Sequence, residues 1–377
     1  MSTLKHRTNQ IRIIMKNNYL IKLVLCAFLA VSTFAEAQLN TPRGSQMATV
    51  TQRVGTTDIS ITYSRPSVNG REVWGKLVPY GMNNLGFGTA KESPWRAGAN
   101  ENTTISFTDD VTFEGKPVAA GTYGLHIVVN ENNKATIILS SDTDAWGSYF
   151  YDPANDVARA DVTTEAVPHK ELLTYEFNKV DKNSATAALV WEKKAIPFKV
   201  EVDVTNIVLN DIRGKLKGQT GFTRQNWEQA ANFALNNGGD MEEALGWING
   251  AIEGNFFSQK TFNNMAVKAQ ILGKMGDSEG SAKAMDGAAE LANANQLNRL
   301  GYAMMNNKKY DTALKYFKMN VDKDPKNANW HDSLGECYKA MGEKKSAIKH
   351  FKKSLALNPP ANVKANSEKN LKELGVL

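Results

Sequence analysis

The sequence predicts two domains: an all-β antiparallel sandwich or barrel, followed by an all-α helical solenoid. Up to about Asp203, apolar and polar residues alternate with a period of two in short segments, as in half-buried strands. After Gly221, almost every segment has the spacing of an amphipathic helix. The chain has 377 residues, which is long for one core, because single cores usually stop growing at about 250–300 residues. These observations together predict two units of different class.

The N-terminus has the pattern of an export signal. Basic residues precede an apolar run at residues 23–31, and an Ala-Glu-Ala cleavage site follows at residues 35–37. The run is shorter than the ~20 residues that span a bilayer. We therefore expect cleavage after Ala37 and a periplasmic or extracellular protein without a transmembrane anchor. Met1 and Met15 are both candidate start sites, because a start at Met15 leaves a leader of ordinary length.

Removal of this signal changes the charge of the chain. Residues 1–37 contain five basic residues and one acidic residue, so the formal net charge falls from +6 to +2. Nucleic-acid binding depends on clustered Lys and Arg, and the remaining balance does not predict it. Cys26 lies in the leader, where Leu25 takes the place of the small residue that a lipidation motif needs before its cysteine. Cys337 is then the single thiol, which excludes an internal disulfide.

Residues 38–205 are predicted to form the β domain. Period-two alternation is clearest in three segments: 57–63, 103–107 and 199–204. Residues 122–129 and 135–139 are more continuously apolar and flank a polar turn, so they are predicted to form a central hairpin. Residues 81–94 break the pattern and are predicted to form a long loop. Short strands without long helices between them favour an antiparallel sandwich or barrel over a parallel sheet.

The helical part begins with a predicted linker at 206–223, which consists of a helix at 206–217 and a hinge at 218–221. The decisive signal beyond it is internal repetition at an offset of 34 residues. Five positions recur at this offset: Leu300, Gly301, Ala313, Phe317 and Pro325 return as Leu334, Gly335, Ala347, Phe351 and Pro359. Such spacing is typical of paired antiparallel helices, in which small residues lie where helices touch and large ones fill the space between them.

This pattern resembles the tetratricopeptide repeat over residues 224–377, with the best copies at 294–327 and 328–361 and a C-terminal capping helix. Two upstream copies are degenerate. The resemblance implies a groove that takes a protein or peptide partner. The groove-facing positions of the two best copies would be Asn298, Tyr302, Met305, Asp332, Glu336 and Lys339. The alternative is a structural spacer or dimerisation array, and the pattern does not define the oligomeric state.

The β-rich half also carries phrases that are specific in combination. They are Tyr-Ser-Arg-Pro-Ser-Val-Asn-Gly-Arg at 63–71, Leu-Val-Pro-Tyr-Gly at 77–81, Trp-Arg-Ala-Gly-Ala-Asn-Glu-Asn-Thr-Thr at 95–104, Gly-Thr-Tyr at 121–123 and Asp-Ala-Trp-Gly at 144–147. Together they resemble the family called domain of unknown function 2911. Members are exported bacterial proteins, sometimes with tetratricopeptide repeats after the β domain. The loop at 82–94 departs from the family pattern, and the family implies no activity.

Within this half, the candidate pocket residues are Trp95, Arg96, Asn100, Glu101 and His126. They combine a stacking surface with hydrogen-bond donors and acceptors, as carbohydrate and small polar ligand sites do. A structural interpretation competes with this one: Arg96 would pair with Glu101 or another acid, Trp95 would cap the sandwich, and His126 would be a hydrogen-bonded core histidine. The sequence therefore favours a non-enzymatic binding or adaptor protein. The alternative is an envelope enzyme or a carbohydrate-binding module with its polar pocket in the β domain.

No cofactor or metal is predicted. Asp142, Asp144 and Asp152 lack the dense spacing of an EF-hand loop. The histidines have no zinc-site spacing, and neither a nucleophile elbow nor a phosphate-binding loop is present. A further hypothesis assigns the Lys-rich segment at 339–372 to an anionic surface, although such helix faces are more often solvated.

Overall fold

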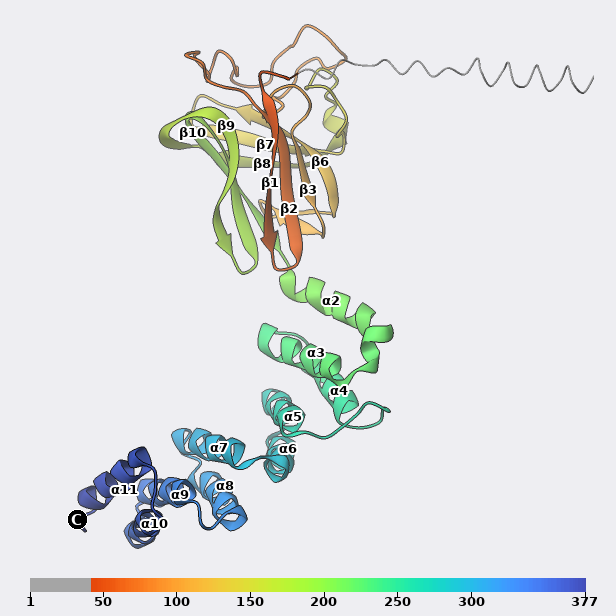
Figure 1. The fold of residues 1–377 in the computed structure, drawn as a ribbon. Helices are drawn as coiled ribbons and strands as arrows, with labels where there is room; N and C mark the ends of the chain where they lie inside the picture. The colour runs from red at the N-terminus through yellow and green to blue at the C-terminus, as the bar shows by residue number, and fades with distance from the viewer. Residues whose placement is uncertain (1–41) are drawn as a thin grey trace, which may run out of the picture.

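The computed structural model describes residues 42–377, so the proposed leader and its cleavage site after Ala37 lie outside the described residues. Figure 1 shows a β sandwich at the N-terminal end, followed by a curved row of helices that ends at the C-terminus. This is the predicted order of an antiparallel β domain and a helical solenoid. Two sheets that pack face to face make the β domain a sandwich.

All strand pairs in the two sheets are antiparallel. The six-stranded sheet has the order β1-β2-β3-β6-β7-β8, and the four-stranded sheet has the order β5-β4-β10-β9. The strands are β1 (Gln46–Val54), β2 (Thr57–Arg65), β3 (Thr104–Phe107), β4 (Val111–Phe113), β5 (Lys116–Val118), β6 (Gly121–Val129), β7 (Lys134–Ser140), β8 (Asp156–Thr163), β9 (Glu165–Asp181) and β10 (Ser184–Val202).

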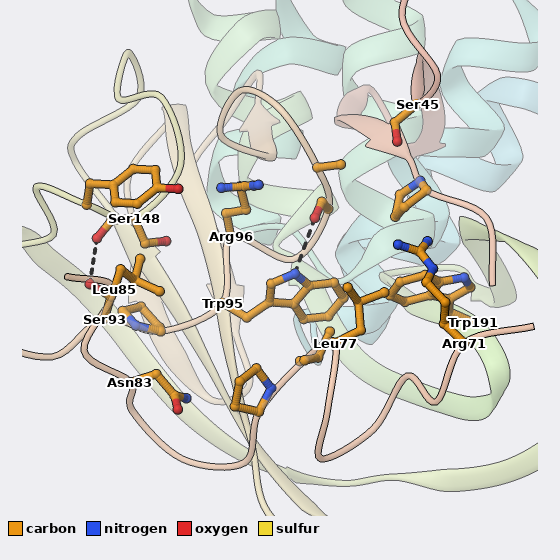
Figure 2. Close-up of a pocket in the computed structure, with 17 residues that line it drawn as sticks. Ser45, Arg71, Leu77, Asn83, Leu85, Ser93, Trp95, Arg96, Ser148 and Trp191 are labelled. Carbon is orange, nitrogen blue, oxygen red and sulfur yellow. Dashed lines mark hydrogen bonds between the residues drawn. The ribbon is translucent and has the colours of Figure 1, made fainter. Parts of the chain in front are cut away.

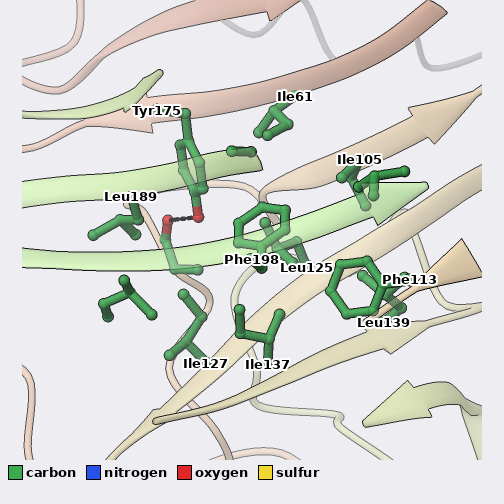
Figure 3. Close-up of a cluster of buried hydrophobic side chains, with 14 of the residues drawn as sticks. Ile61, Ile105, Phe113, Leu125, Ile127, Ile137, Leu139, Tyr175, Leu189 and Phe198 are labelled. Carbon is green, nitrogen blue, oxygen red and sulfur yellow. Dashed lines mark hydrogen bonds between the residues drawn. The ribbon is translucent and has the colours of Figure 1, made fainter. Parts of the chain in front are cut away.

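The core lies between the sheets because alternate residues of each strand point inward. Ile61 of β2, Leu125 of β6 and Ile137 of β7 contribute from one sheet, and Phe113 and Phe198 contribute from the other. All five are fully buried, and Figure 3 shows their side chains meeting between the strands. The period-two pattern of the sequence is therefore the inward and outward alternation of a sandwich.

The predicted central hairpin is confirmed as β6 and β7, joined by a turn in which the Asn130 N–H donates to the Lys134 carbonyl at 2.9 Å. These strands are apolar on both faces because loops cover their outer side. Met82 from the long loop at 66–103 packs there with Val128, Ile138 and Tyr151. The outer face of this sheet is thus a second, smaller core.

His126 belongs to this covered outer face. The residue is 2% exposed, and its Nδ1 lies 3.1 Å from the Ser148 hydroxyl. Its ring meets the ring of Tyr151 edge to face, with 5.7 Å between centroids. Burial lowers the pKa of His126 to about 4, so the imidazole is neutral at pH 7.

The helix α2 (Val204–Leu216) joins the two domains and packs against both. Val204 and Ile207, at its start, pack against the core of the sandwich. Leu209 is buried in the first core of the helical domain, which Ile212 also contacts. The sequence predicts a connecting helix here, and the structure shows that this helix carries apolar residues toward both cores.

The helices after α2 form antiparallel pairs that stack along the array (Figure 1). They are α3 (Arg224–Asn237), α4 (Met241–Ile252), α5 (Phe262–Lys274), α6 (Ser278–Leu291), α7 (Ala294–Asn306), α8 (Tyr310–Lys323), α9 (Ala328–Ala340), α10 (Lys344–Ala356) and α11 (Ala361–Glu373), with a short 3-10 turn at Gln219–Phe222 before α3. The predicted helical solenoid is therefore confirmed.

The recurring glycines have a steric cause. A Cβ added at Gly301 of α7 would lie 2.5 Å from the ring of Phe317 on α8, and one at Gly335 of α9 would lie 2.9 Å from the ring of Phe351 on α10. Both phenylalanines are fully buried. A larger residue would push the paired helices apart, which explains why Gly and Phe recur together at the 34-residue offset.

We predict that Gly335→Ala destabilises the array, because the new methyl group overlaps a buried ring that has little room to move. The expected loss of unfolding free energy is about 1–3 kcal/mol, less the ~1 kcal/mol that Ala gains over Gly in a helix. Urea unfolding followed by circular dichroism at the helical band measures it. Gly246→Ala in α4 is the control, since a Cβ there meets no atom within 4 Å. Equal effects of the two changes would contradict the steric explanation.

We also predict that His126 makes the β domain sensitive to acid. Its pKa is about 4 in the folded protein and roughly 6.5 in the unfolded chain, so only the unfolded chain gains a proton between these values. The unfolding free energy is therefore undiminished by His126 above about pH 6.5. It falls by at most roughly 3 kcal/mol as the pH drops toward 4. His126→Asn, which cannot take up this proton, should have a flatter profile in urea unfolding across this pH range. Parallel profiles would disprove the assignment.

Candidate functional site

A cavity of about 340 Å³ lies between the long loop at 66–103, the loop at 141–155 and Trp191 of β10. Its volume is within the range of small-molecule sites, roughly 300–1,000 Å³. Figure 2 shows Trp95 in the middle of the cavity, with Arg96 on one side and Trp191 and Arg71 on the other. The cavity therefore has an aromatic centre and two guanidinium groups.

Trp95 and Trp191 form the aromatic centre, and Trp74 packs against both. Trp95 and Trp191 are stacked, with 6.0 Å between ring centroids and 18° between planes. Trp74 meets both of them edge to face, also at 6.0 Å. The Trp95 indole N–H donates to the Gly98 carbonyl at 3.2 Å. This packing holds the Trp95 ring in one orientation.

A short stretch of pairing with β6 places Trp95 and Arg96. The Trp95 N–H donates to the Ile127 carbonyl at 3.0 Å, and the Ile127 N–H donates back at 2.8 Å. Directly paired residues share a face and successive residues alternate, so Trp95 points inward with Ile127 while Arg96 points outward. The buried Tyr175 hydroxyl donates to the Ala97 carbonyl at 3.0 Å and secures the turn that follows.

Arg96 lies between the cavity and the loop at 141–155. Its guanidinium carbon is 5.7 Å from the centre of the Trp146 ring, a cation–π distance. Gly147 has φ +80°, a backbone conformation that favours glycine, and a Cβ there would come within 2.6 Å of the guanidinium. The Arg96 Nε is buried and has no hydrogen-bond partner within residues 42–377.

Asn100 and Glu101 hold the N-terminal segment beside the cavity. The Asn100 amide donates to the Ser45 carbonyl at 2.9 Å, and Glu101 forms an ion pair with Arg43. The pKa of Glu101 is below its usual value, mainly through a hydrogen bond from its own backbone and then through Arg43 and Arg96. Glu101 is thus paired with Arg43, and its effect on Arg96 is Coulombic only.

The five β-domain candidates therefore divide into three groups. Trp95 and Arg96 line the cavity, Asn100 and Glu101 hold the N-terminal segment, and His126 lies beneath the loops. His126 shares the outer face with Arg96 but does not line the cavity. Sequence reasoning missed the other lining residues, among them Arg71 and Trp191. Arg71 lies in the family phrase at 63–71 and could have been found from it, whereas Trp191 has no local signal.

In the helical array, the candidates on α7 face α9. The Tyr302 hydroxyl donates to the Glu336 carboxylate at 2.5 Å and lies 3.0 Å from the Ser333 hydroxyl. Burial, followed by the charge of Glu336, raises the pKa of this phenol. Asn298 has a buried Oδ1 without a partner among the described residues, and Met305 packs partly buried beside the core that α7, α8 and α9 share.

The candidates on α9 contact the C-terminal helix α11. The Asn366 amide donates to Asp332 at 2.7 Å and to Glu336 at 2.9 Å, and Lys339 donates to Asn370 at 2.6 Å. Asp332 is 4% exposed, and burial raises the pKa of its carboxyl. Asp332 therefore joins α9 to α11 and is not open to a ligand, whereas Glu336 is only partly covered.

Within residues 42–377, no cluster of three or more His, Cys, Asp or Glu side chains is arranged to hold a metal ion. No helix in the same range combines the length and the apolar character that a membrane span requires.

Comparison with solved structures finds matches of low sequence identity. A crystal structure of MamA has 15% identity and a TM-score of 0.29, covering 41% of this chain and 89% of that one. YrrB, described as a TPR protein with an unusual peptide-binding site, has 16% identity and a TM-score of 0.28, covering 44% and 84%. MamA from Desulfovibrio magneticus RS-1 has 19% identity and a TM-score of 0.26, covering 40% and 90%.

Family models match one region in each domain. Residues 45–200 match the protein family of unknown function DUF2911, and residues 328–361 match the tetratricopeptide repeat. No curated protein matches the chain. The repeat match supports a protein-binding or adaptor role. The chain thus carries a DUF2911 region followed by tetratricopeptide repeats, in the order that the sequence predicts.

Proposed function

We propose that this protein is an exported adaptor whose tetratricopeptide array docks a protein partner. The observation that carries the proposal is the array itself, in which α7, α9 and α11 lie side by side and are joined by side-chain hydrogen bonds. Stacked repeats present an extended surface, and such surfaces commonly bind peptides or helices of other proteins. The array also occupies nearly half of the described chain, from α3 to α11.

The chemistry of this face suits an extended peptide. Asn298 is partly exposed on α7, and an asparagine side-chain amide can form hydrogen bonds with the backbone of a peptide. Met305 adds a flexible apolar side chain nearby, and such side chains adapt to varied partners. The partly exposed carboxylate of Glu336 lies on the neighbouring helix. We therefore place the docking surface on α7 and on the adjacent part of α9.

A capture experiment with the full mature chain tests this surface. The triple variant Asn298→Ala, Met305→Ala and Glu336→Gln should recover its main protein partner from envelope extract at a level at least about tenfold lower, because residues central to an interface can each be worth ~2 kcal/mol or more. Quantitative mass spectrometry of the captured proteins measures the change.

The matched control changes three exposed lysines on α10, in the triple variant Lys345→Ala, Lys352→Ala and Lys353→Ala. We expect this control to capture the partner as the natural protein does. Circular dichroism establishes that both variants keep their helices. Equal capture by the two variants would contradict docking on α7 and α9.

Export is the second part of the proposal and rests on the leader pattern at residues 1–37. We expect the protein purified from its native cells to begin at Gln38 and to fractionate with the periplasm or the culture medium. N-terminal sequencing of that protein measures the cleavage site. An intact leader on the purified protein would rule out cleavage after Ala37.

A further inference from the structure

Exposed aromatic side chains gather beside the cavity of the β domain. Phe87 from the long loop is 68% exposed, and Trp146 and Phe150 from the loop at 141–155 are 56% and 47% exposed. Together with Tyr149 they form what we call the aromatic platform. Contiguous exposed apolar surface of this kind is uncommon on soluble proteins and usually marks a binding site.

The rings of the platform support one another. Trp146 and Tyr149 are stacked, with 6.2 Å between centroids and 6° between planes. Phe87 meets Tyr149 edge to face at 5.6 Å and Phe150 at 5.9 Å. Because these contacts fix the rings before any ligand arrives, a ligand that stacks on them loses little affinity to ordering the site.

The platform and the cavity form one continuous surface. Tyr149 belongs to the platform and also lines the cavity. Arg96 lines the cavity and lies against the Trp146 ring at 5.7 Å. A ligand that binds on the platform is therefore within reach of the guanidinium of Arg96.

Among residues 42–377, neither arginine of the cavity forms an ion pair, and Glu101 and Glu171 act on Arg96 and Arg71 by Coulombic attraction alone. Arg71 donates to the backbone carbonyls of Val68 and Ser67, at 3.1 and 2.5 Å. Among the residues that the structure describes, the arginines that form ion pairs are others: Arg43, Arg53, Arg159, Arg213 and Arg224. Arg96 lines the cavity, but its Nε is buried, so a ligand would meet the terminal nitrogens of this guanidinium. The cavity is thus suited to an anionic group.

We propose that the aromatic platform and the cavity bind an acidic carbohydrate, that is, a sugar residue carrying a carboxylate. The C–H face of the sugar ring stacks on Trp146 and Tyr149, where it removes apolar surface from water. The carboxylate accepts hydrogen bonds from Arg96, whose planar guanidinium fits this group in a bidentate manner. Asn83, at the cavity wall, offers a side-chain amide to the hydroxyl groups. This site is separate from the helical array, so its failure leaves the adaptor proposal untouched.

Isothermal titration calorimetry of the full mature chain tests the ligand class. The probes are D-glucuronate, D-galacturonate, N-acetylmuramate and N-acetylneuraminate, each measured against its uncharged amide or methyl ester, with acetate as a simple carboxylate. We expect at least one acidic sugar to bind about tenfold or more tightly than its uncharged form. Acetate should bind far more weakly than that sugar, since it cannot stack. Absence of binding by all four acids, or equal binding of acetate, would overturn the proposal.

Two variants assign the roles of the residues. Arg96→Gln should remove the preference for the acid, so that the acid binds as weakly as its uncharged form. Trp146→Ala should weaken both forms together, because it removes the stacking surface. Controls with matched chemistry are Arg53→Gln on β1 and Phe256→Ala, both at exposed positions away from the cavity. If Arg96→Gln and Trp146→Ala bind the acid as the controls do, the site lies elsewhere. The preference of the natural protein for acids tests the proposal even if a variant does not fold.

Discussion

The paired hydrogen bonds between Trp95 and Ile127 are the constraint on which the β-domain site depends. The loop at 66–103 has no regular strand of its own, so it needs an anchor on the sheet. Successive side chains of a strand point to opposite faces. Once Trp95 pairs with β6, its indole therefore lies toward Trp191, and the next side chain, Arg96, lies on the opposite face. The Tyr175 hydroxyl, which holds the Ala97 carbonyl, fixes the end of this stretch from β9 in the other sheet. Two backbone hydrogen bonds thus place the Trp95 indole against Trp191 and the Arg96 guanidinium on the other side.

The helical array depends on a different kind of contact, in which the absence of a side chain is essential. Gly301 and Gly335 let the rings of Phe317 and Phe351 pack directly on the backbone of the facing helix. This close approach within each helix pair brings α7, α9 and α11 near one another. Tyr302, Glu336 and Asn366 then form hydrogen bonds across these three helices. The polar face of the array is therefore ordered by its own side chains before a partner binds, which lowers the entropic cost of binding.

The sequence was sufficient for features that depend on periodicity. It predicted the β6–β7 hairpin from two apolar runs and the helix pairs from the 34-residue offset, because both patterns are set by local geometry. It was insufficient for contacts between distant segments. Nothing near Trp95 indicates that Trp191 will stack on it, and Glu101 pairs with Arg43 instead of its neighbour Arg96. The offset likewise identifies the side of α9 that bears Asp332, but it does not reveal that α11 will cover that residue.

The helix α2 determines how the two domains are joined. A flexible linker would leave the sandwich and the array independent, because a free chain transmits no geometry. In α2, however, Val204 and Ile207 pack on the sandwich core, and Leu209 packs in the first helical core one turn later. The tip of the β1–β2 hairpin reinforces this junction, since Gly55 lies so close to Val204 that a Cβ there would be 2.5 Å from its side chain. The apolar residues of α2 thus pack in the cores of both domains, which fixes the start of the helical array against the sandwich.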